Sequence, residues 1–198
     1  MSDQSDLLPY APPQARVWHI AFLVLGSTCL PINFAYAIDG ASFSVGAANE
    51  LRAARLALKW DWQRQPWEFR GLTIDGYWDV SGIYWNNPNL SGSAYGVSAS
   101  PVFRFTPRNT KWLGGRPFGE LGVGVAVLGD TNIPNGTPRG RRMGSRFQFE
   151  NRLVLGLTFG EQLELAYQFL HHSNGDLASD NNGIDTHLFR IAWKLSGK

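Results

Sequence analysis

The sequence predicts an all-β protein, an eight-stranded antiparallel transmembrane β-barrel of the outer-membrane type, preceded by an N-terminal export signal. From Ile38 onward, alternating segments of about ten residues recur with turn residues between them, which is the pattern of an outer-membrane barrel. No run of ~18 apolar residues follows that point. The chain also holds 22 glycines and 13% aromatic residues, a composition that suits a sheet with many close turns.

The first 37 residues are predicted to be the export signal. Val17–Phe34 is predominantly apolar, and the Ala-Tyr-Ala tripeptide that ends at Ala37 has the small-x-small pattern of a cleavage site. A membrane anchor is the alternative, but Pro31 and Asn33 interrupt the run and leave fewer than the ~20 apolar residues that a spanning helix needs. We therefore expect a signal peptide over 1–37 and a single barrel domain over 38–198.

Eight segments with a two-residue period follow the signal. Successive side chains of a strand point to opposite faces, so alternating polarity defines one apolar and one polar face. In the segment that ends at Phe159, for example, Leu153, Leu155 and Leu157 alternate with polar residues such as Arg152. The predicted strands are Gly40–Asn49, Leu51–Trp62, Trp67–Trp85, Ser91–Thr106, Pro117–Asp130, Ser145–Phe159, Leu163–Ser173 and Ile184–Leu195.

The polar faces of these strands carry nearly balanced charge. Eight strands enclose an interior just wide enough for side chains, so we expect ion pairs to fill the barrel and predict no channel. A soluble lipocalin-type barrel is the structural alternative, because alternation alone does not distinguish the inner face from the outer one. The inward acids are Asp61, Asp75, Asp79, Glu120, Glu150 and Glu164, the inward bases are Arg55, Lys59, Arg152, Arg190 and Lys194, and the tryptophans expected in interfacial girdles are Trp60, Trp62, Trp67, Trp78, Trp85 and Trp193.

Three residues with catalytic chemistry lie on the apolar face of the last two strands. In Leu163–Ser173 the odd positions are Leu, Leu, Tyr and Phe, followed by His171 and Ser173, and Asp185 begins the apolar face of the next strand. With both chain ends on the periplasmic side, the three residues are expected together at the outer rim. The loops expected to face the exterior are Asn86–Leu90, Thr131–Gly144 and Asn174–Gly183.

These residue types fit nucleophilic hydrolysis. Serine is a weak nucleophile until a base accepts its proton and a third group orients that base. His171 and Ser173 share a face at a separation of about 6.5 Å, so the strand must kink or end there, and Gly175 permits the bend. Asp185, on the neighbouring strand, can reach the far nitrogen of His171. Asn174 and the amide of Gly175 are candidates for the oxyanion hole.

The motif around these residues resembles a known enzyme family. His171-His172-Ser173-Asn174, followed by Asn182-Gly183-Ile184-Asp185, is similar to the lipid A 3-O-deacylases, the PagL family, of Gram-negative outer membranes. Trp60–Trp62, Gly76–Asp79 and Gly144–Asn151 extend the similarity to essentially the whole mature chain. The resemblance implies an enzyme that hydrolyses the ester at position 3 of lipid A without a cofactor and releases a 3-hydroxy fatty acid.

The resemblance also implies roles for individual residues. Ser173 would be the nucleophile, His171 the base, Asp185 the orienting acid, Asn174 an oxyanion contributor and Asn181 a support for the loop. Family members commonly carry Glu where this chain has Asp185. Because Asp is one methylene shorter, either the two strands approach more closely or the triad is looser.

Other polar residues near the rim have competing interpretations. The parity of His172 points inward, which favours His171 as the base. His187 shares the outer face with Asp185 and is expected to be an interfacial residue. Three arginines of the loop Thr131–Gly144 are candidates either for contacts with lipid A phosphates or for a solvated loop. They are Arg139, Arg141 and Arg142.

Two other functions compete with the deacylase. A non-enzymatic structural or adhesive barrel would leave the triad as ordinary rim residues, whereas an outer-membrane phospholipase or acyltransferase would use a similar serine. The net charge of +2 does not suit a nucleic-acid binder. No metal is expected, because the histidines lack a metal constellation and the only cysteine, Cys29, lies in the signal. Lipopolysaccharide is the expected partner, and the sequence leaves monomer and homodimer open.

Overall fold

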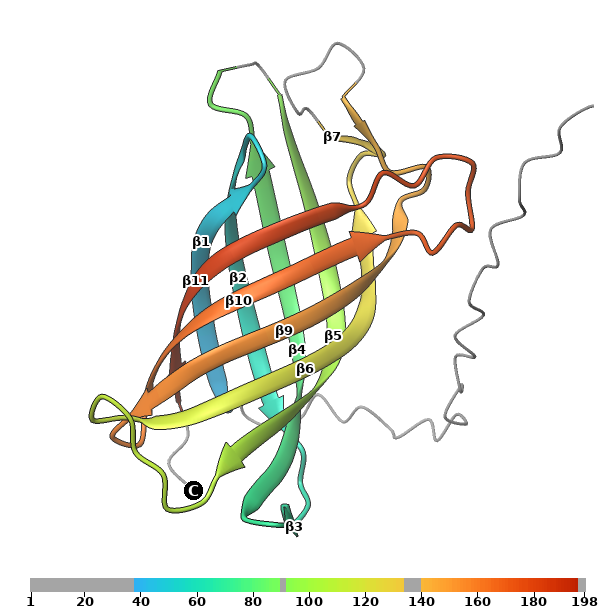
Figure 1. Ribbon diagram of the computed structural model, residues 1–198. Helices are drawn as coiled ribbons and strands as arrows, with labels where there is room; N and C mark the ends of the chain where they lie inside the picture. The colour runs from blue at the N-terminus through green and yellow to red at the C-terminus, as the bar shows by residue number, and fades with distance from the viewer. Residues whose placement is uncertain (1–37, 90–91, 134–139, 196–198) are drawn as a thin grey trace, which may run out of the picture. The chain divides into compact units, whose positions relative to one another are not determined.

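The computed structural model describes residues 38–89, 92–133 and 140–195, and the export signal predicted over 1–37 lies outside them. Long antiparallel strands close into a barrel in the order β2-β1-β11-β10-β9-β6-β5-β4, and pairing of β2 with β4 completes the ring (Figure 1). The wall strands are β1 (Gly40–Ala48), β2 (Leu51–Asp61), β4 (Leu72–Asn86), β5 (Ser93–Pro107), β6 (Arg116–Leu128), β9 (Phe147–Phe159), β10 (Leu163–Ser173) and β11 (Ile184–Lys194).

The predicted eight-stranded barrel is confirmed, with two local differences in the strands. The predicted strand Trp67–Trp85 is a hairpin of β3 (Trp67–Phe69) and β4. Its two-residue turn, Arg70 and Gly71, has φ angles of 45° and 84°, and two positive φ values in succession reverse the chain tightly. The connection between β6 and β9 contains a second small sheet, in which β7 (Asn132–Ile133) pairs with β8 (Arg141–Arg142).

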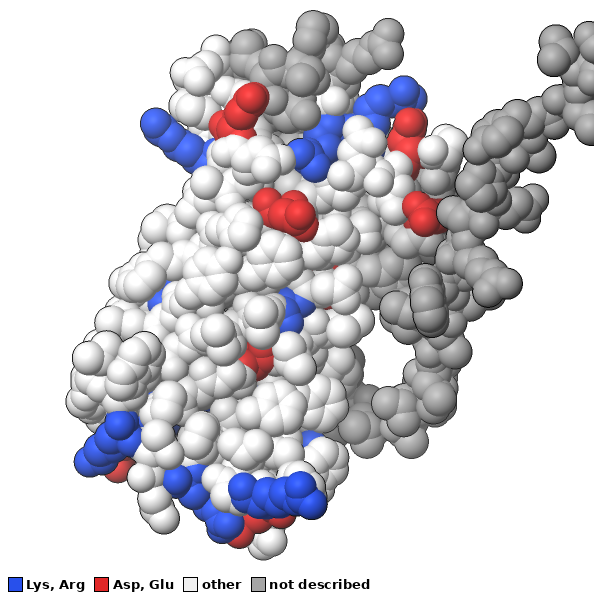
Figure 2. All heavy atoms as spheres, in the orientation of Figure 1, with Lys and Arg blue, Asp and Glu red and all other residues white. Residues whose placement is uncertain are grey.

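The outer surface of the barrel is apolar and its interior is polar. Along β9, Leu153 and Leu155 are exposed, whereas Gln148, Glu150 and Arg152 are buried. Figure 2 shows charged side chains gathered mainly at the two ends of the barrel, with a band of mostly uncharged side chains between them. This is the inverse of a soluble sheet protein and the arrangement that a membrane barrel requires. None of the described segments forms a helix long and apolar enough to cross a membrane.

Two groups of buried ion pairs lie in the interior, as predicted from the balanced charges. Of the other predicted inward charges, Lys59 and Asp61 form a separate pair at 3.1 Å, in which the Asp61 side chain is 49% exposed. Arg152 contacts Asp79 and Glu150, each at 2.8 Å, and Arg55 contacts Asp79 at 2.6 Å. The second group lies near the start of β10, the strand that carries Glu164. In this group Arg190 contacts Glu120 at 2.8 Å and Glu164 at 3.3 Å. Two members of the second group were not among the inward charges predicted from the sequence. They are Arg104, which contacts Glu164 at 2.7 Å, and Tyr77, whose hydroxyl donates to Glu120 at 2.8 Å.

An apolar core closes the barrel interior at the end where β10 meets β11 through residues 174–183. Trp85, fully buried, is its largest member, and its Nε1 donates to Thr186 Oγ1 at 3.1 Å. The prediction of Trp85 as a girdle residue is therefore wrong. Its odd position on β4 places it on the inner face, opposite to Trp78 and Tyr84. Its neighbours in the core include Leu51, Ile83, Leu128, Met143, Leu170, Ile184 and Leu188.

We expect Arg152→Met to lower the free energy of unfolding by about 3–5 kcal/mol, because Asp79 and Glu150 would lose the guanidinium that they share. Urea unfolding of the barrel in detergent, followed by tryptophan fluorescence, measures this. The control is Arg108→Met, which breaks a pair of similar length with Glu68, 2.6 Å, whose side chains are 45% and 62% exposed. That exposed pair should contribute less than about 1 kcal/mol, so an equal loss in both variants would contradict the prediction.

Candidate active site

His171 and Asp185 face each other across neighbouring strands on the outer surface of the barrel. The β10–β11 ladder pairs the two residues directly, and His171 Nδ1 lies 2.6 Å from Asp185 Oδ1. Their side chains are 38% and 55% exposed. A carboxylate at Nδ1 fixes the imidazole tautomer and orientation, which leaves Nε2 to accept a proton from a nucleophile. The contact predicted between these residues is present despite the shorter Asp side chain.

Ser173 lies two residues beyond His171, on the same face and at the last position of β10. The strand ends there, as the spacing of the two residues predicted, and Gly175 and Asp176 follow with φ angles of 64° and 62°. In the described part of the chain no hydrogen bond joins Ser173 Oγ to His171. Catalytic hydrogen bonds often tighten only when substrate is bound, so this geometry is compatible with a serine and base pair.

Asn174 is buried, and its side chain connects two loops. Its Nδ2 donates to the carbonyl of Met143 at 2.9 Å and to that of Asp180 at 2.7 Å. Its backbone N–H donates to Asn181 Oδ1 at 3.0 Å. All three of its N–H groups are therefore engaged in the protein, and none is available to an oxyanion in this arrangement. This geometry disagrees with the predicted oxyanion role of Asn174 and makes the residue a structural tie.

Asn181 braces the loop between β10 and β11 from within. Its Oδ1 accepts from Asn174, and its Nδ2 donates to Asp176 Oδ1 at 2.8 Å. These two bonds link the start of the loop to its end, in keeping with the loop-supporting role expected for Asn181. Gly175, whose amide is the other predicted oxyanion donor, lies between Asn174 and Asp176, the two residues that Asn181 contacts. Within residues 38–89, 92–133 and 140–195, that amide has no acceptor.

The loop between β6 and β9 also contacts the β10–β11 loop, at residues 180–183. Arg141 Nη1 donates to the carbonyls of Asn182 and Gly183, and Arg142 Nη2 lies 2.7 Å from Asp180 Oδ2. Gly144, at φ 72°, lets the two loops touch, because a Cβ there would collide with the Asp180 carbonyl. Two of the three predicted phosphate ligands thus have a role in loop support. The third, Arg139, lies outside the described residues.

His172 points into the barrel, which confirms the prediction from parity. It is fully buried, its Nε2 lies 3.2 Å from Glu150 Oε2, and its ring meets Trp85 edge to face at 5.5 Å. Because the barrel wall separates it from the outer surface, His172 has no access to the face that carries Ser173. Of the two adjacent histidines, only His171 can contact Asp185.

Two further outward polar residues, which were not among the candidates from the sequence, lie on the same outer face as His171. Asn151, exposed on β9, is the direct ladder partner of His171 on the side away from Asp185. The hydroxyl of Tyr167, on β10, lies 2.6 Å from His187 Nδ1. Both occupy odd positions of strands whose odd positions are otherwise mostly apolar. Each could therefore have been noticed in the sequence as a polar group on the apolar face.

Comparisons with known proteins agree with this geometry. The family model for lipid A 3-O-deacylase (PagL) matches residues 52–194. The chain is 31% identical over 149 residues to lipid A deacylase PagL of Pseudomonas aeruginosa, which covers 74% of this chain and 80% of that protein. It is also 28% identical over 109 residues to lipid A deacylase PagL of Bordetella bronchiseptica, covering 54% and 55% of the two chains.

A solved structure shows the same fold. The crystal structure of the outer membrane enzyme PagL superposes with a TM-score of 0.66 at 29% identity. The match covers 77% of this chain and 97% of the other. The likeness therefore extends over nearly the whole of the solved chain.

We expect Asn174→Ala to loosen the β10–β11 loop while the barrel wall stays intact. Loss of two hydrogen bonds of about 1 kcal/mol each predicts amide exchange in residues 174–183 that is about 10- to 30-fold faster. Hydrogen–deuterium exchange with mass spectrometry measures this. Asn182→Ala is the control, since Asn182 is exposed and bonds through its backbone. Unchanged exchange in Asn174→Ala would show that the ties do not order the loop.

Proposed function

Because this chain belongs to the lipid A 3-O-deacylase (PagL) family, we propose that Ser173, His171 and Asp185 act as nucleophile, base and orienting acid in its reaction. The protein is an integral outer-membrane β-barrel and a lipid A deacylase, an ester hydrolase. It removes the acyl chain at position 3 of lipid A. The observation that carries the triad is the 2.6 Å contact of His171 with Asp185, on the face and at the strand end where Ser173 lies.

The proposed reaction proceeds through an acyl-enzyme. His171 Nε2 accepts the Ser173 proton as Oγ attacks the ester carbonyl, and the carbonyl oxygen becomes an oxyanion. The intermediate collapses when the bond to the sugar oxygen breaks and His171 returns the proton to that oxygen. A water, deprotonated by His171, then attacks the acyl-enzyme. The bond between the acyl carbon and Ser173 Oγ breaks, His171 returns the proton to Oγ, and the fatty acid leaves. Asp185 stabilises the imidazolium that forms in both steps.

The amide of Gly175 is assigned the role of donating a hydrogen bond to the oxyanion. This amide follows the nucleophile by two residues and lacks an acceptor in the described part of the protein. Asn174 and Asn181 would act through it, because their hydrogen bonds fix the turn that aims the amide. Preorganised donors of this kind contribute about 3–4 kcal/mol to acyl transfer. No cofactor takes part in this scheme.

The substrate would approach from within the membrane. The triad faces outward from the barrel wall near one end, the place where a lipid ester of the outer leaflet would lie. Arg142 remains a candidate for a lipid A phosphate, because its side chain is 59% exposed even while it contacts Asp180. A guanidinium on a loop beside the site would meet such an anion through charge-assisted hydrogen bonds.

Ser173→Ala is expected to lower deacylation at least about 1,000-fold, because the acyl-enzyme can no longer form. Mass spectrometry of lipid A from cells that express each form measures the loss of one hydroxyacyl chain. The wild type should remove the chain and the variant should not. Removal by both forms would refute Ser173 as the nucleophile.

A pair of histidine variants tests the choice of base. His171→Gln should lower kcat at least about 1,000-fold, because no imidazole would remain to accept the Ser173 proton. His172→Gln should keep more than about a tenth of the wild-type activity, because its ring lies inside the barrel against Glu150. Assays on folded barrels in detergent, with folding checked by gel mobility, give both values. The reverse order of activities would contradict the assignment.

A further inference from the structure

The outward face of β9 carries a single polar side chain, and it lies next to the proposed base. Asn151 is exposed, whereas every other odd position of β9 is Phe or Leu. Within residues 38–89, 92–133 and 140–195, the side-chain amide of Asn151 makes no hydrogen bond. Polar groups that face lipid are costly, and where they occur they commonly mark functional sites. The unused amide therefore points to a ligand from outside the protein.

Strand pairing places this amide beside the proposed triad. Asn151 and His171 are direct ladder partners, so their Cβ atoms are about 4.5–5.5 Å apart. Ser173 pairs with Phe149, which makes Ser173 the diagonal neighbour of Asn151 at about 7–8 Å. Asp185 occupies the other side of His171, on β11. The proposed base thus has its acid on one side and a free amide on the other.

The imidazole of His171 leans away from Asn151. Its Nδ1 contacts Asp185 at 2.6 Å, on the β11 side. On that same side, a Cβ added to Gly183 would lie 3.2 Å from His171 Cε1 and 3.8 Å from Nε2. Gly183 therefore gives the ring room to lean toward β11. The β9 side of the ring, which Asn151 borders, is where an ester carbonyl can reach Ser173.

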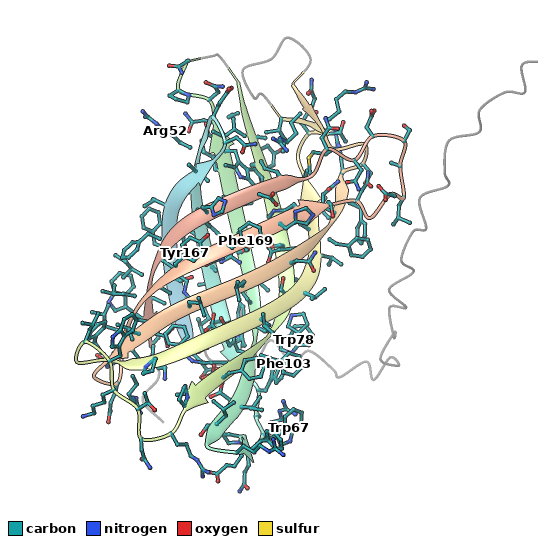
Figure 3. All side chains as sticks on the ribbon, viewed as in Figure 1. Arg52, Trp67, Trp78, Phe103, Tyr167 and Phe169 are labelled. Carbon is teal, nitrogen blue, oxygen red and sulfur yellow. The ribbon has the colours of Figure 1, made fainter. Side chains whose placement is uncertain are left out.

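The wall toward the start of β10 suits the acyl chain attached to that carbonyl. The next outward ladder pair there is Phe169 with Leu153, and Tyr167 lies two residues farther along β10. Figure 3 shows Phe169 and Tyr167 on the outer wall of the barrel. An acyl chain that lies along this wall would hold its carbonyl in the adjacent polar row, which Asn151 and His171 form.

We propose that Asn151 Nδ2 donates a hydrogen bond to the ester carbonyl oxygen as it becomes an oxyanion, alongside the amide of Gly175. This inference rests on the proposed function and adds a catalytic residue to the same site. When Ser173 Oγ bonds to the carbonyl carbon, the carbonyl electron pair moves to the oxygen, and Asn151 keeps its proton throughout. Asn174 does not supply this donor, because its N–H groups are engaged in the loops. Since such a bond strengthens as charge develops, it lowers the barrier more than it aids binding.

Two variants remove the proposed donor. Asn151→Leu replaces the amide with an apolar side chain of similar size, and Asn151→Asp keeps the shape without an N–H. In folded protein in detergent, each should lower kcat for lipid A deacylation about 100- to 1,000-fold, the effect of one oxyanion donor, and change KM less than about threefold. Val123→Ala is the control, because Val123 is exposed on β6 and is the other ladder partner of Asn151. Its kcat should stay within about twofold of the wild type.

Two further measurements separate catalysis from folding. A long-chain alkyl fluorophosphonate reacts with a nucleophilic serine, and its phosphoryl oxygen then occupies the position of the oxyanion. The rate of inactivation by this reagent should fall in parallel with kcat in both Asn151 variants. The urea midpoint of Asn151→Leu should equal or exceed that of the wild type, because an apolar side chain replaces an amide that faces lipid.

Each possible result decides the proposal. An active wild type with unchanged kcat in Asn151→Leu would overturn the oxyanion role and leave the deacylase proposal intact. A raised KM with unchanged kcat would show binding of the ground state alone and overturn the role as well. A urea midpoint that falls together with kcat in both variants would show a structural role instead. A wild type that deacylates no lipid A would refute the proposed function and this inference together.

Discussion

The closed hydrogen-bond ladder of eight strands is the constraint on which the structure depends. In a closed ring each wall residue faces either lipid or a lumen of fixed small volume, and its parity decides which. The ladder therefore places His171 outside and His172 inside, although the two are adjacent in sequence. It also sets His171 directly opposite Asp185, so the contact between them needs no support from a loop. Two members of the proposed triad thus lie in the barrel wall itself.

The lumen explains why this wall holds its shape. Charged side chains buried in so small a space are tolerated only when each has a partner, and Arg152 and Arg190 each bridge two carboxylates. Arg152 on β9 reaches Asp79 on β4, and Arg190 on β11 reaches Glu120 on β6, so these two contacts connect strands that are not neighbours in the wall. At the site end the charges give way to an apolar core around Trp85. His172 contacts both Glu150 and Trp85, so the strand that carries His171 is anchored from behind by each group.

The alternation of polar and apolar residues predicted the features that strand pairing determines, and few of the contacts that the loops make. It predicted the eight strands, the balanced lumen and the meeting of His171 with Asp185. It could not predict the tie from Asn174 to Met143, because that contact joins loops distant in sequence through backbone carbonyls, which have no sequence signature. The Arg70–Gly71 turn was missed because only its second residue is a typical turn former. Trp85 was predicted to be a girdle residue because it is aromatic, although its odd position on β4 indicated the inner face.

The outward position of the proposed triad determines how the enzyme meets its substrate. A lipid reaches His171 and Ser173 by diffusing sideways in the leaflet, so encounter is a two-dimensional process that never requires the substrate to leave its bilayer. The rate then depends on the mole fraction of substrate among neighbouring lipids, and its concentration in bulk water is irrelevant. The released fatty acid enters the same leaflet, where it accumulates beside the barrel that produced it. Turnover thus changes the solvent in which the enzyme itself is dissolved.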